Sequence, residues 1–340
     1  MLDGETLSLD ARATLLSCSS IGLARGSDVR PFGPRGWSRL ADRLAERGGS
    51  PGGLVGMSRL DLQTLFGPDS ADDVDRLDRL LSRSGQLGFE LERLATLGIW
   101  VRTTADAGYP ARLRSRLGAD APPVLFGAGE PSLLDRGGVA IIGSRDVDDE
   151  ALDFTRRLAD AVARASELVI SGGARGVDQV SMTAAFEAGG SVVGVLPEGV
   201  ERRIRESTTR AAIAQGLAAV ASPWHPAAGF SAGAAMARNK IVYALSDVAV
   251  VVSSSQGSGG TWAGAMEALD ADWVPVLVRQ GEGVPEGNRA LISRGGRPID
   301  FGTIESSVTA LELIAAAGPA ERRVAEEPAP FEQQELALRE

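Results

Sequence analysis

The sequence predicts an α/β protein with a doubly wound, mostly parallel sheet and a small helical domain at its amino-terminal end. Three observations support this prediction. Apolar β-branched runs recur through the second half of the chain, amphipathic helical patterns separate them, and short glycine turns follow several of the runs. Near-continuous apolar strands that alternate with helices are typical of a sheet that is covered on both faces.

Length and composition define the class of protein. The chain has 340 residues, enough for two or three domains, and a net charge of -10 at pH 7. No apolar run could span a bilayer, and the first residues lack the basic-then-apolar form of a signal peptide, so we expect a cytoplasmic protein with no membrane partner. The single cysteine, Cys18, and the single histidine, His225, exclude an internal disulfide and a Cys/His zinc site.

We expect three regions along the chain. Residues 1–90 show apolar positions at helical spacing and form the small helical domain. Residues 91–300 form the sheet domain, which opens with an extension of strands and proline turns at 91–138. Residues 301–340 contain one more helix, at 308–317, and a glutamate-rich tail from 321 that is typical of a loosely attached segment.

The sheet domain begins with a strand, helix, strand unit. Residues 139–142 and 168–170 are apolar and β-branched, and apolar residues between them recur at helical spacing. Such a crossover makes the two strands parallel, so the turns that follow them lie at one edge of the sheet. Further strands are expected at 192–196, 218–221, 248–252 and 274–278, and further helices at 178–188, 206–215, 234–245 and 261–269.

Four short segments of this domain are candidates for binding an anion. Glycine lets backbone N–H groups approach an anion closely, and the helix that follows adds its positive end. We expect the arginines of three segments to converge on one groove at the sheet edge, where a polyanion can lie. The candidate residues are Gly143, Ser144, Arg145, Ser171, Gly172, Gly173, Arg175, Gly176, Arg238, Asn239, Lys240, Ser258, Gly259, Gly260 and Thr261.

These segments do not match the motifs of common nucleotide enzymes. A dinucleotide site requires G-x-G-x-x-G after the first strand, and the first turn here has one glycine. A P-loop requires a lysine beside its last glycine, and no lysine lies near a suitable turn. His225, between two prolines and without a G-x-S-x-G serine, is interpreted as a loop residue. We therefore expect binding without catalytic residues, cofactor or metal.

Aromatic side chains could supply stacking surfaces for bases. Trp224, Phe230 and Trp262 are candidates, whereas the helical spacing of Tyr243 with Ile241 and Leu245 favours a place in the core. Arginines at separate turns could contact successive phosphates of a single strand, and neither contact depends on the base sequence.

Several stretches carry a resemblance to a known family. VAIIGSRD, ISGGARGVDQVSMTAA, ARNKIVYALSDVAVVV, GSGGTWAGAMEAL and GNRALISRGG occur in this order. Over 94–297 the chain resembles the DNA-processing protein A family, also called DprA or Smf. The resemblance implies a Rossmann-like fold and a homodimer that binds single-stranded DNA and hands it to RecA recombinase in recombination or natural transformation. It also implies a SAM-like or helix-hairpin-like amino-terminal domain.

The resemblance also implies a set of binding residues. In the family a positive pocket is formed by the arginine after the first strand, by the SG-x-ARG-x-D loop and by the RN-[RK] motif. The matching residues here are Arg145, Ser171, Gly172, Arg175, Gly176, Asp178, Arg238, Asn239 and Lys240. The chain departs from the family pattern at Met182, Gly257 and Ala263, and the winged-helix domain found at the carboxyl end of many members is not expected.

The alternative is a nucleotide-processing or nucleotide-sensing protein related to the Lonely-guy phosphoribohydrolases. Those enzymes carry P-G-G-x-G-T-x-x-E, which Gly259-Gly260-Thr261 followed by Glu267 matches in part. The glutamate comes six residues after the threonine instead of three, which turns it about 300° further round a helix, at about 100° per residue.

Overall fold

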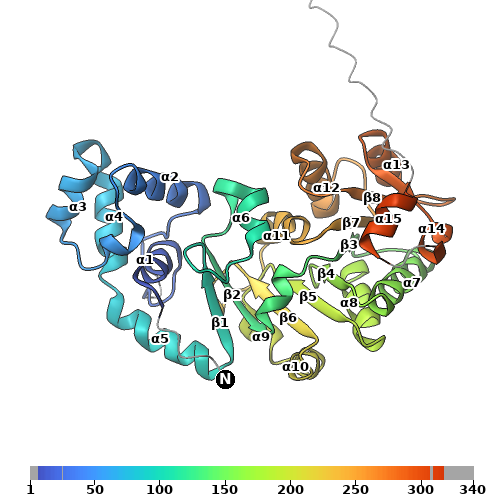
Figure 1. Cartoon of the computed structure of the whole chain (residues 1–340), viewed down its shortest axis with the longest axis horizontal. Helices are drawn as coiled ribbons and strands as arrows, with labels where there is room; N and C mark the ends of the chain where they lie inside the picture. The colour runs from blue at the N-terminus through green and yellow to red at the C-terminus, as the bar shows by residue number, and fades with distance from the viewer. Residues whose placement is uncertain (1–6, 25, 307–308, 318–340) are drawn as a thin grey trace, which may run out of the picture.

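A computed structural model describes residues 7–24, 26–306 and 309–317, and it confirms the predicted α/β fold. Its strands form a single sheet (Figure 1). They are β1 (Ile99–Thr103), β2 (Val124–Gly129), β3 (Val139–Gly143), β4 (Leu168–Ser171), β5 (Ser191–Val195), β6 (Ala218–Ser222), β7 (Val248–Ser253), β8 (Val276–Arg279) and β9 (Arg297–Ile299).

The order of the strands is β1-β2-β6-β5-β4-β3-β7-β8-β9. In this order, all neighbouring strands between β6 and the β9 edge pair in parallel. At the other edge, β2 pairs antiparallel with β6, and β1 pairs antiparallel with β2. The chain fills the sheet on one side of β3 first, and then crosses to the other side to form β7. The carboxyl ends of β3 and β7 therefore lie at the topological switch point, where ligands of doubly wound proteins bind.

Among the described residues, five helices precede the first strand and lie together on the left of Figure 1. Leu94 of the last helix shares a hydrophobic cluster with Phe126 of β2 and Val220 of β6, so these helices pack onto one face of the sheet. The division into domains stays a prediction, since one core runs across the expected boundary. The helices are α1 (Leu9–Cys18), α2 (Pro34–Ala45), α3 (Arg59–Phe66), α4 (Ala71–Leu81) and α5 (Ser84–Thr96), with 3-10 turns η1 (Pro51–Leu54) and η2 (Pro68–Ser70).

The other helices cover both faces of the sheet. Side chains of β3 alternate between the faces, with Ala140 in the cluster of one face and Ile141 in that of the other. One face is covered by α6 (Ala111–Leu117), α11 (Ala232–Leu245), α12 (Gly259–Ala271) and α13 (Glu286–Ser293). The other is covered by α7 (Asp149–Arg164), α8 (Val177–Glu187), α10 (Ser207–Ala214), α14 (Phe301–Ser306) and α15 (Ala310–Ala316).

Short elements complete the fold: α9 (Val200–Arg203) and the 3-10 turns η3 (Gly118–Asp120) and η4 (Pro131–Asp135). The sequence pattern missed α6, α9, α13, α14 and β9, which are short elements over which periodicity gives a weak signal. The predicted tail from 321 lies outside the described residues. Within the described part of the chain, no helix combines the length and the apolar character needed to cross a membrane.

Candidate nucleic-acid interface

The loops after β3 and β4 touch each other at the carboxyl edge of the sheet. Gly176 has φ +82°, and a Cβ atom built on it would lie 2.5 Å from the Ser144 carbonyl oxygen and 2.8 Å from the Arg145 Cα. A side chain at position 176 is therefore excluded by both backbone conformation and space. Arg175 directly precedes Gly176, and Arg145 is one of the residues that Gly176 approaches. The close contact of the two loops therefore places both arginines on one surface.

Both of these arginines are exposed. The Arg145 guanidinium lies over the ring of Phe230, with its Cζ 5.4 Å from the ring centroid. Arg175 has a side chain that is 75% exposed and an ion pair of 3.5 Å with the almost fully exposed Asp146. Two guanidinium groups can thus reach a polyanion at this surface without any movement of the core.

Arg238 is placed differently from the expectation that it lines the groove. Its side chain is only 4% exposed, and its Nη1 atom donates to the carbonyl oxygens of Gly172 and Val195, at the ends of β4 and β5. Burial lowers the pKa of the Arg238 guanidinium, and the negative charge of Asp178 opposes this shift. The contact of Arg238 with DNA stays a prediction, but in the free protein its guanidinium joins two strand ends.

The next residue, Asn239, contacts Arg238 itself: its Oδ1 accepts a hydrogen bond from Arg238 Nε at 3.2 Å. The Asn239 Nδ2 group donates to the Gly260 carbonyl oxygen at 2.8 Å, which ties α11 to the first turn of α12. Lys240 is half-buried, and its positive charge lowers the pKa of Asp120, although Arg35 contributes more to that shift. The three residues of the RN-[RK] motif therefore do not form one cationic cluster.

The loop after β4 is fixed by hydrogen bonds on both sides. The Ser171 hydroxyl donates to the Ile141 carbonyl oxygen at 2.6 Å, and Nη2 of Arg203 donates to the Gly173 carbonyl oxygen at 3.0 Å. The sequence reasoning missed Arg203. A signal was available, since Arg202 and Arg203 follow a predicted strand that ends at the same edge.

The start of α12 is open to solvent. Ser258 is its N-cap residue but makes no side-chain capping hydrogen bond, and the first turn contains no acidic residue. Ser258 and Gly259 are exposed, whereas Gly260 and Thr261 are half-buried. The unpaired N–H groups of a helix start attract anions, so this turn could contribute to the same interface.

Asp178 is buried next to Arg238. Burial raises the pKa of the Asp178 carboxyl, and the charge of Arg238 counteracts it. Asp178 lines a cavity of about 10 Å³ together with Gly172, Asn239 and Tyr243, a volume that accommodates one water molecule at most. The confirmed burial of Tyr243 and the size of the cavity give this region a structural role.

Among the aromatic candidates for base stacking, Phe230 is the most accessible. Its side chain is 52% exposed at the end of the loop that follows β6. Trp224 is half-buried in the same loop, and Trp262 packs against the core of the sheet.

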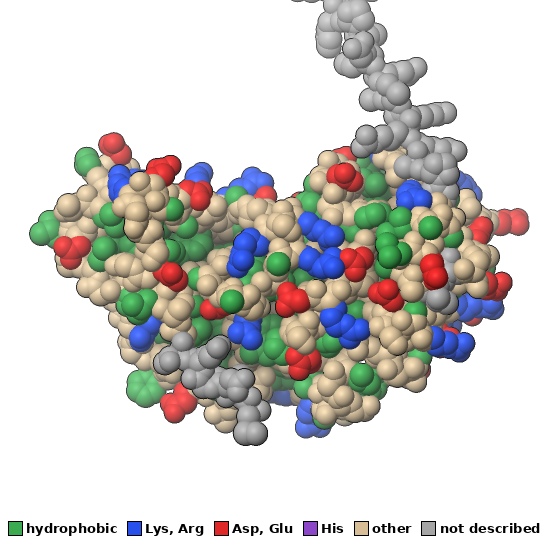
Figure 2. All heavy atoms as spheres, in the orientation of Figure 1, with side chains coloured by type: hydrophobic (Ala, Val, Ile, Leu, Met, Phe, Trp, Pro, Cys, Tyr) green, Lys and Arg blue, Asp and Glu red, His purple; other side chains and the backbone are tan. Residues whose placement is uncertain are grey.

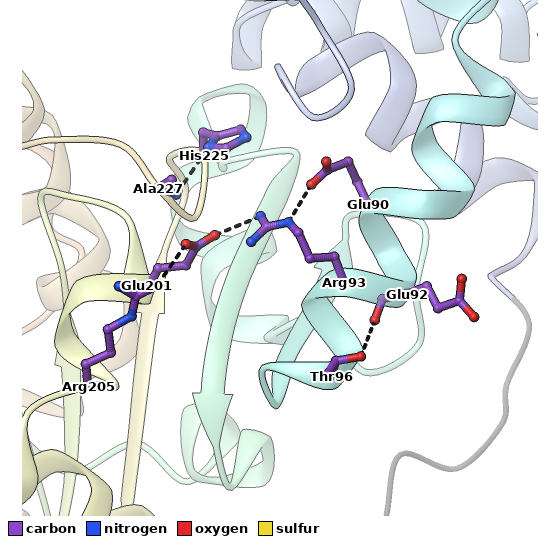
Figure 3. A network of polar contacts seen from close by, with 8 residues as sticks. All are labelled: Glu90, Glu92, Arg93, Thr96, Glu201, Arg205, His225 and Ala227. Atoms are coloured by element: carbon purple, nitrogen blue, oxygen red, sulfur yellow. Dashed lines mark hydrogen bonds and ion pairs between the residues drawn. The ribbon is translucent and has the colours of Figure 1, made fainter.

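The loop after β6 also touches an ionic link between the amino-terminal helices and the sheet (Figure 3). Arg93 of α5 donates to Glu90 and to Glu201 of α9, each at 2.8 Å. His225 lies beside them, and its Nδ1 accepts a hydrogen bond from the Ala227 N–H at 3.1 Å. His225 lies in the loop between β6 and α11, as interpreted, and burial lowers its pKa.

Charge is mixed over the face shown in Figure 2, where blue and red side chains alternate. A wide groove of about 610 Å³ opens between η3 and α12, and Asp120, Glu267 and Asp270 line it. These carboxylates repel phosphate, and Glu267 of the hydrolase alternative lies in this groove instead of beside the glycine loops. Among the described residues, no cluster of three His, Cys, Asp or Glu side chains could hold a metal ion.

Comparisons with known proteins identify relatives of the chain. The sequence profile of the DNA recombination-mediator protein A family matches residues 100–303, which include the whole edge described above. The DNA processing protein DprA of Bacillus subtilis (strain 168) is 32% identical over 94 residues. That match covers 27% of this chain and 31% of the relative, so the chain spans about a third of the curated relative that it matches.

Two solved structures share the fold. DNA processing protein A of Streptococcus pneumoniae superposes with a TM-score of 0.57 at 20% identity, over 83% of this chain and 98% of that chain. The protein of Helicobacter pylori, whose structure was described for its mode of binding single-stranded DNA, superposes with a TM-score of 0.50 at 24% identity. The second match covers 60% of this chain and 92% of that chain.

Proposed function

The chain belongs to the DNA recombination-mediator protein A family, and from this we propose that it binds single-stranded DNA at the carboxyl edge of its sheet. The binding is expected to be independent of base sequence and to involve no chemical reaction. The observation that carries the proposal is the contact between the loops after β3 and β4, which puts two exposed arginines on one surface.

The composition of that surface suits a single strand. Arg145 and Arg175 offer guanidinium groups to phosphates, and glycine-rich loops beside them let the DNA backbone come close. Phe230 presents part of its ring next to Arg145, where an unpaired base can stack. Phosphates and ring faces are common to all nucleotides, so such contacts support affinity without sequence preference.

The open first turn of α12, from Ser258 to Thr261, is proposed to accept a further phosphate through backbone N–H groups. Gly143, Ser144, Ser171, Gly172, Gly173 and Gly176 are proposed to shape the loops, while Arg238 and Asn239 hold them in place. Lys240 lies close enough to Asp120 of η3 for its charge to lower the pKa of that carboxyl. We therefore propose that Lys240 contacts the part of the strand that continues towards η3.

Fluorescence anisotropy with a labelled oligo-dT tests the proposal. Arg145→Ala and Arg175→Ala should each weaken binding about fivefold and reduce the log–log salt slope by about 0.7, the value for one lost phosphate contact on a single strand. Arg164→Ala is a matched control, because Arg164 is also 75% exposed and paired with an aspartate, but lies at the far end of α7. Unchanged binding in both edge variants would refute the proposed surface.

Competition experiments separate this proposal from the hydrolase alternative. Unlabelled single-stranded DNA should displace the probe, whereas double-stranded DNA and nucleoside monophosphates should displace it far less well. Release of free base from a monophosphate, lost in Glu267→Gln, would favour the hydrolase instead.

Two further parts of the proposal rest on family resemblance alone. We propose that the protein forms a homodimer and that it delivers the strand to RecA recombinase in recombination or transformation. Light scattering coupled to gel filtration measures the first, and nucleation of RecA filaments on DNA coated with single-strand-binding protein measures the second.

A further inference from the structure

The turn between β3 and α7 has an unusual distribution of charge for its place in the fold. It ends the central strand beside the switch point, where a doubly wound protein most often places a phosphate on the start of the following helix. Here Asp146, Asp148, Asp149 and Glu150 occupy four of five consecutive positions.

These carboxylates take the place that an anion would need. Oδ1 of Asp148 accepts the Ala151 N–H at 2.7 Å as the N-cap of α7, and Asp149 and Glu150 fill the first turn. Glu150 also lies 2.9 Å from the buried Arg279 guanidinium. A DNA phosphate that approached α7 would therefore meet negative charge at a helix start where the Ala151 N–H already has an acceptor.

The start of α8 is similar, because the buried Asp178 lies in its first turn. On the opposite face of the sheet, α12 begins without an acidic residue and without a side-chain cap. The helix starts on the two faces thus differ at the same edge, since α7 and α8 begin with acidic residues and α12 does not. The helix starts of α7 and α8 are unfavourable to a polyanion, whereas the first turn of α12 is open to it.

Asp146 connects this acidic turn to the proposed binding surface. Its carboxylate is 95% exposed and lies 3.5 Å from Nη2 of Arg175, whose side chain is 75% exposed. An ion pair between two exposed side chains is weak, so an incoming phosphate can displace the carboxylate. While the pair persists, Arg175 is not fully available to DNA.

We propose that Asp146 is an internal competitor of the DNA phosphate: it holds Arg175 in the free protein and, with Asp149, directs the strand away from α7. The strand then runs from Arg175 past Arg145 and Phe230 onto the side of α11 and α12. The inference rests on the proposed binding of single-stranded DNA and adds the route of the strand and a built-in limit on affinity.

Neutralising variants test the competitor. Asp146→Asn should tighten binding of oligo-dT about two- to fivefold at low salt, and the gain should shrink as salt screens the charges. Asp149→Asn should give a smaller gain. Asp160→Asn is the matched control, since Asp160 lies on the same helix but pairs with Arg164 at its other end, and its binding should not change.

A double-mutant cycle and a measurement without DNA complete the test. In an Arg175→Ala background the gain from Asp146→Asn should fall by at least half, and an equal gain in both backgrounds would overturn the competition at Arg175. Without DNA, Asp146→Asn should increase the rate at which phenylglyoxal modifies Arg175, measured by peptide mass spectrometry, and an unchanged rate would overturn the holding contact. If the unmodified protein does not bind oligo-dT, the proposed function fails, while the phenylglyoxal rates still decide whether Asp146 holds Arg175.

Discussion

Arg238→Met is the substitution that separates a structural arginine from a DNA-binding arginine. Methionine retains an unbranched apolar side chain but removes the guanidinium that donates to the carbonyl oxygens of Gly172 and Val195. Both acceptors belong to buried strand ends that solvent reaches poorly. The substitution also leaves the buried Asp178 carboxyl without its opposing charge.

The magnitude follows from those lost partners. A buried polar group left without a hydrogen bond costs about 1–3 kcal/mol, so two carbonyl oxygens cost about 2–6 kcal/mol. This is a large part of the about 5–15 kcal/mol by which ordinary domains are stable. We therefore expect a clear loss of stability before any effect on DNA binding is considered.

Urea unfolding followed by circular dichroism measures the free energy of unfolding. Arg145→Met is the matched control on the same edge; because Arg145 is exposed, its substitution should change the unfolding free energy by less than about 0.5 kcal/mol. The reasoning is refuted if Arg238→Met unfolds at the same urea concentration as the unmodified protein but no longer binds oligo-dT. That result would make Arg238 a direct DNA contact.

Three other substitutions have defined outcomes. Phe230→Ala should weaken oligo-dT binding by about 1–3 kcal/mol, the value of one stacked base, without changing stability, and anisotropy together with urea unfolding measures both. Gly176→Ala should reduce stability and DNA binding together, because a Cβ atom at φ +82° would displace the loop that carries Arg145; an unaffected melting temperature would contradict the close contact. Burial lowers the pKa of His225, the only histidine, so the unfolded chain takes up a proton first as pH falls through about 6.5, and the free energy of unfolding should decrease in that range. His225→Asn should remove this pH dependence in urea titrations at pH 7.5 and 5.5; a decrease of the same size in the variant would refute its assignment to His225.

The sequence allowed the order of strands and helices in the sheet domain to be predicted, because buried parallel strands consist of apolar β-branched runs such as 139–142. It also placed the glycine loops at one edge, since parallel strands end together. Short elements such as β9, with three residues, fall below the length at which periodicity is informative.

The direction of individual side chains was less predictable. Arg238 shares a helical stripe with Ile241, Val242 and Leu245, at i, i+3, i+4 and i+7, and this pattern could have indicated that it is buried. The residue type, however, predicts an exposed side chain, because guanidinium groups are seldom buried. Contacts between loops far apart in sequence, such as Arg145 with Phe230, leave no periodic signal at all.

The outer strand β9 also constrains how two copies could associate. It is three residues long, ends the sheet on the side of β8, and contains Pro298, which has no N–H to donate to a neighbouring strand. A sheet that continues from one copy into the other is therefore disfavoured on this side, and the same feature opposes stacking of molecules into fibres. If two copies paired at this edge, each copy would retain its own separate sheet.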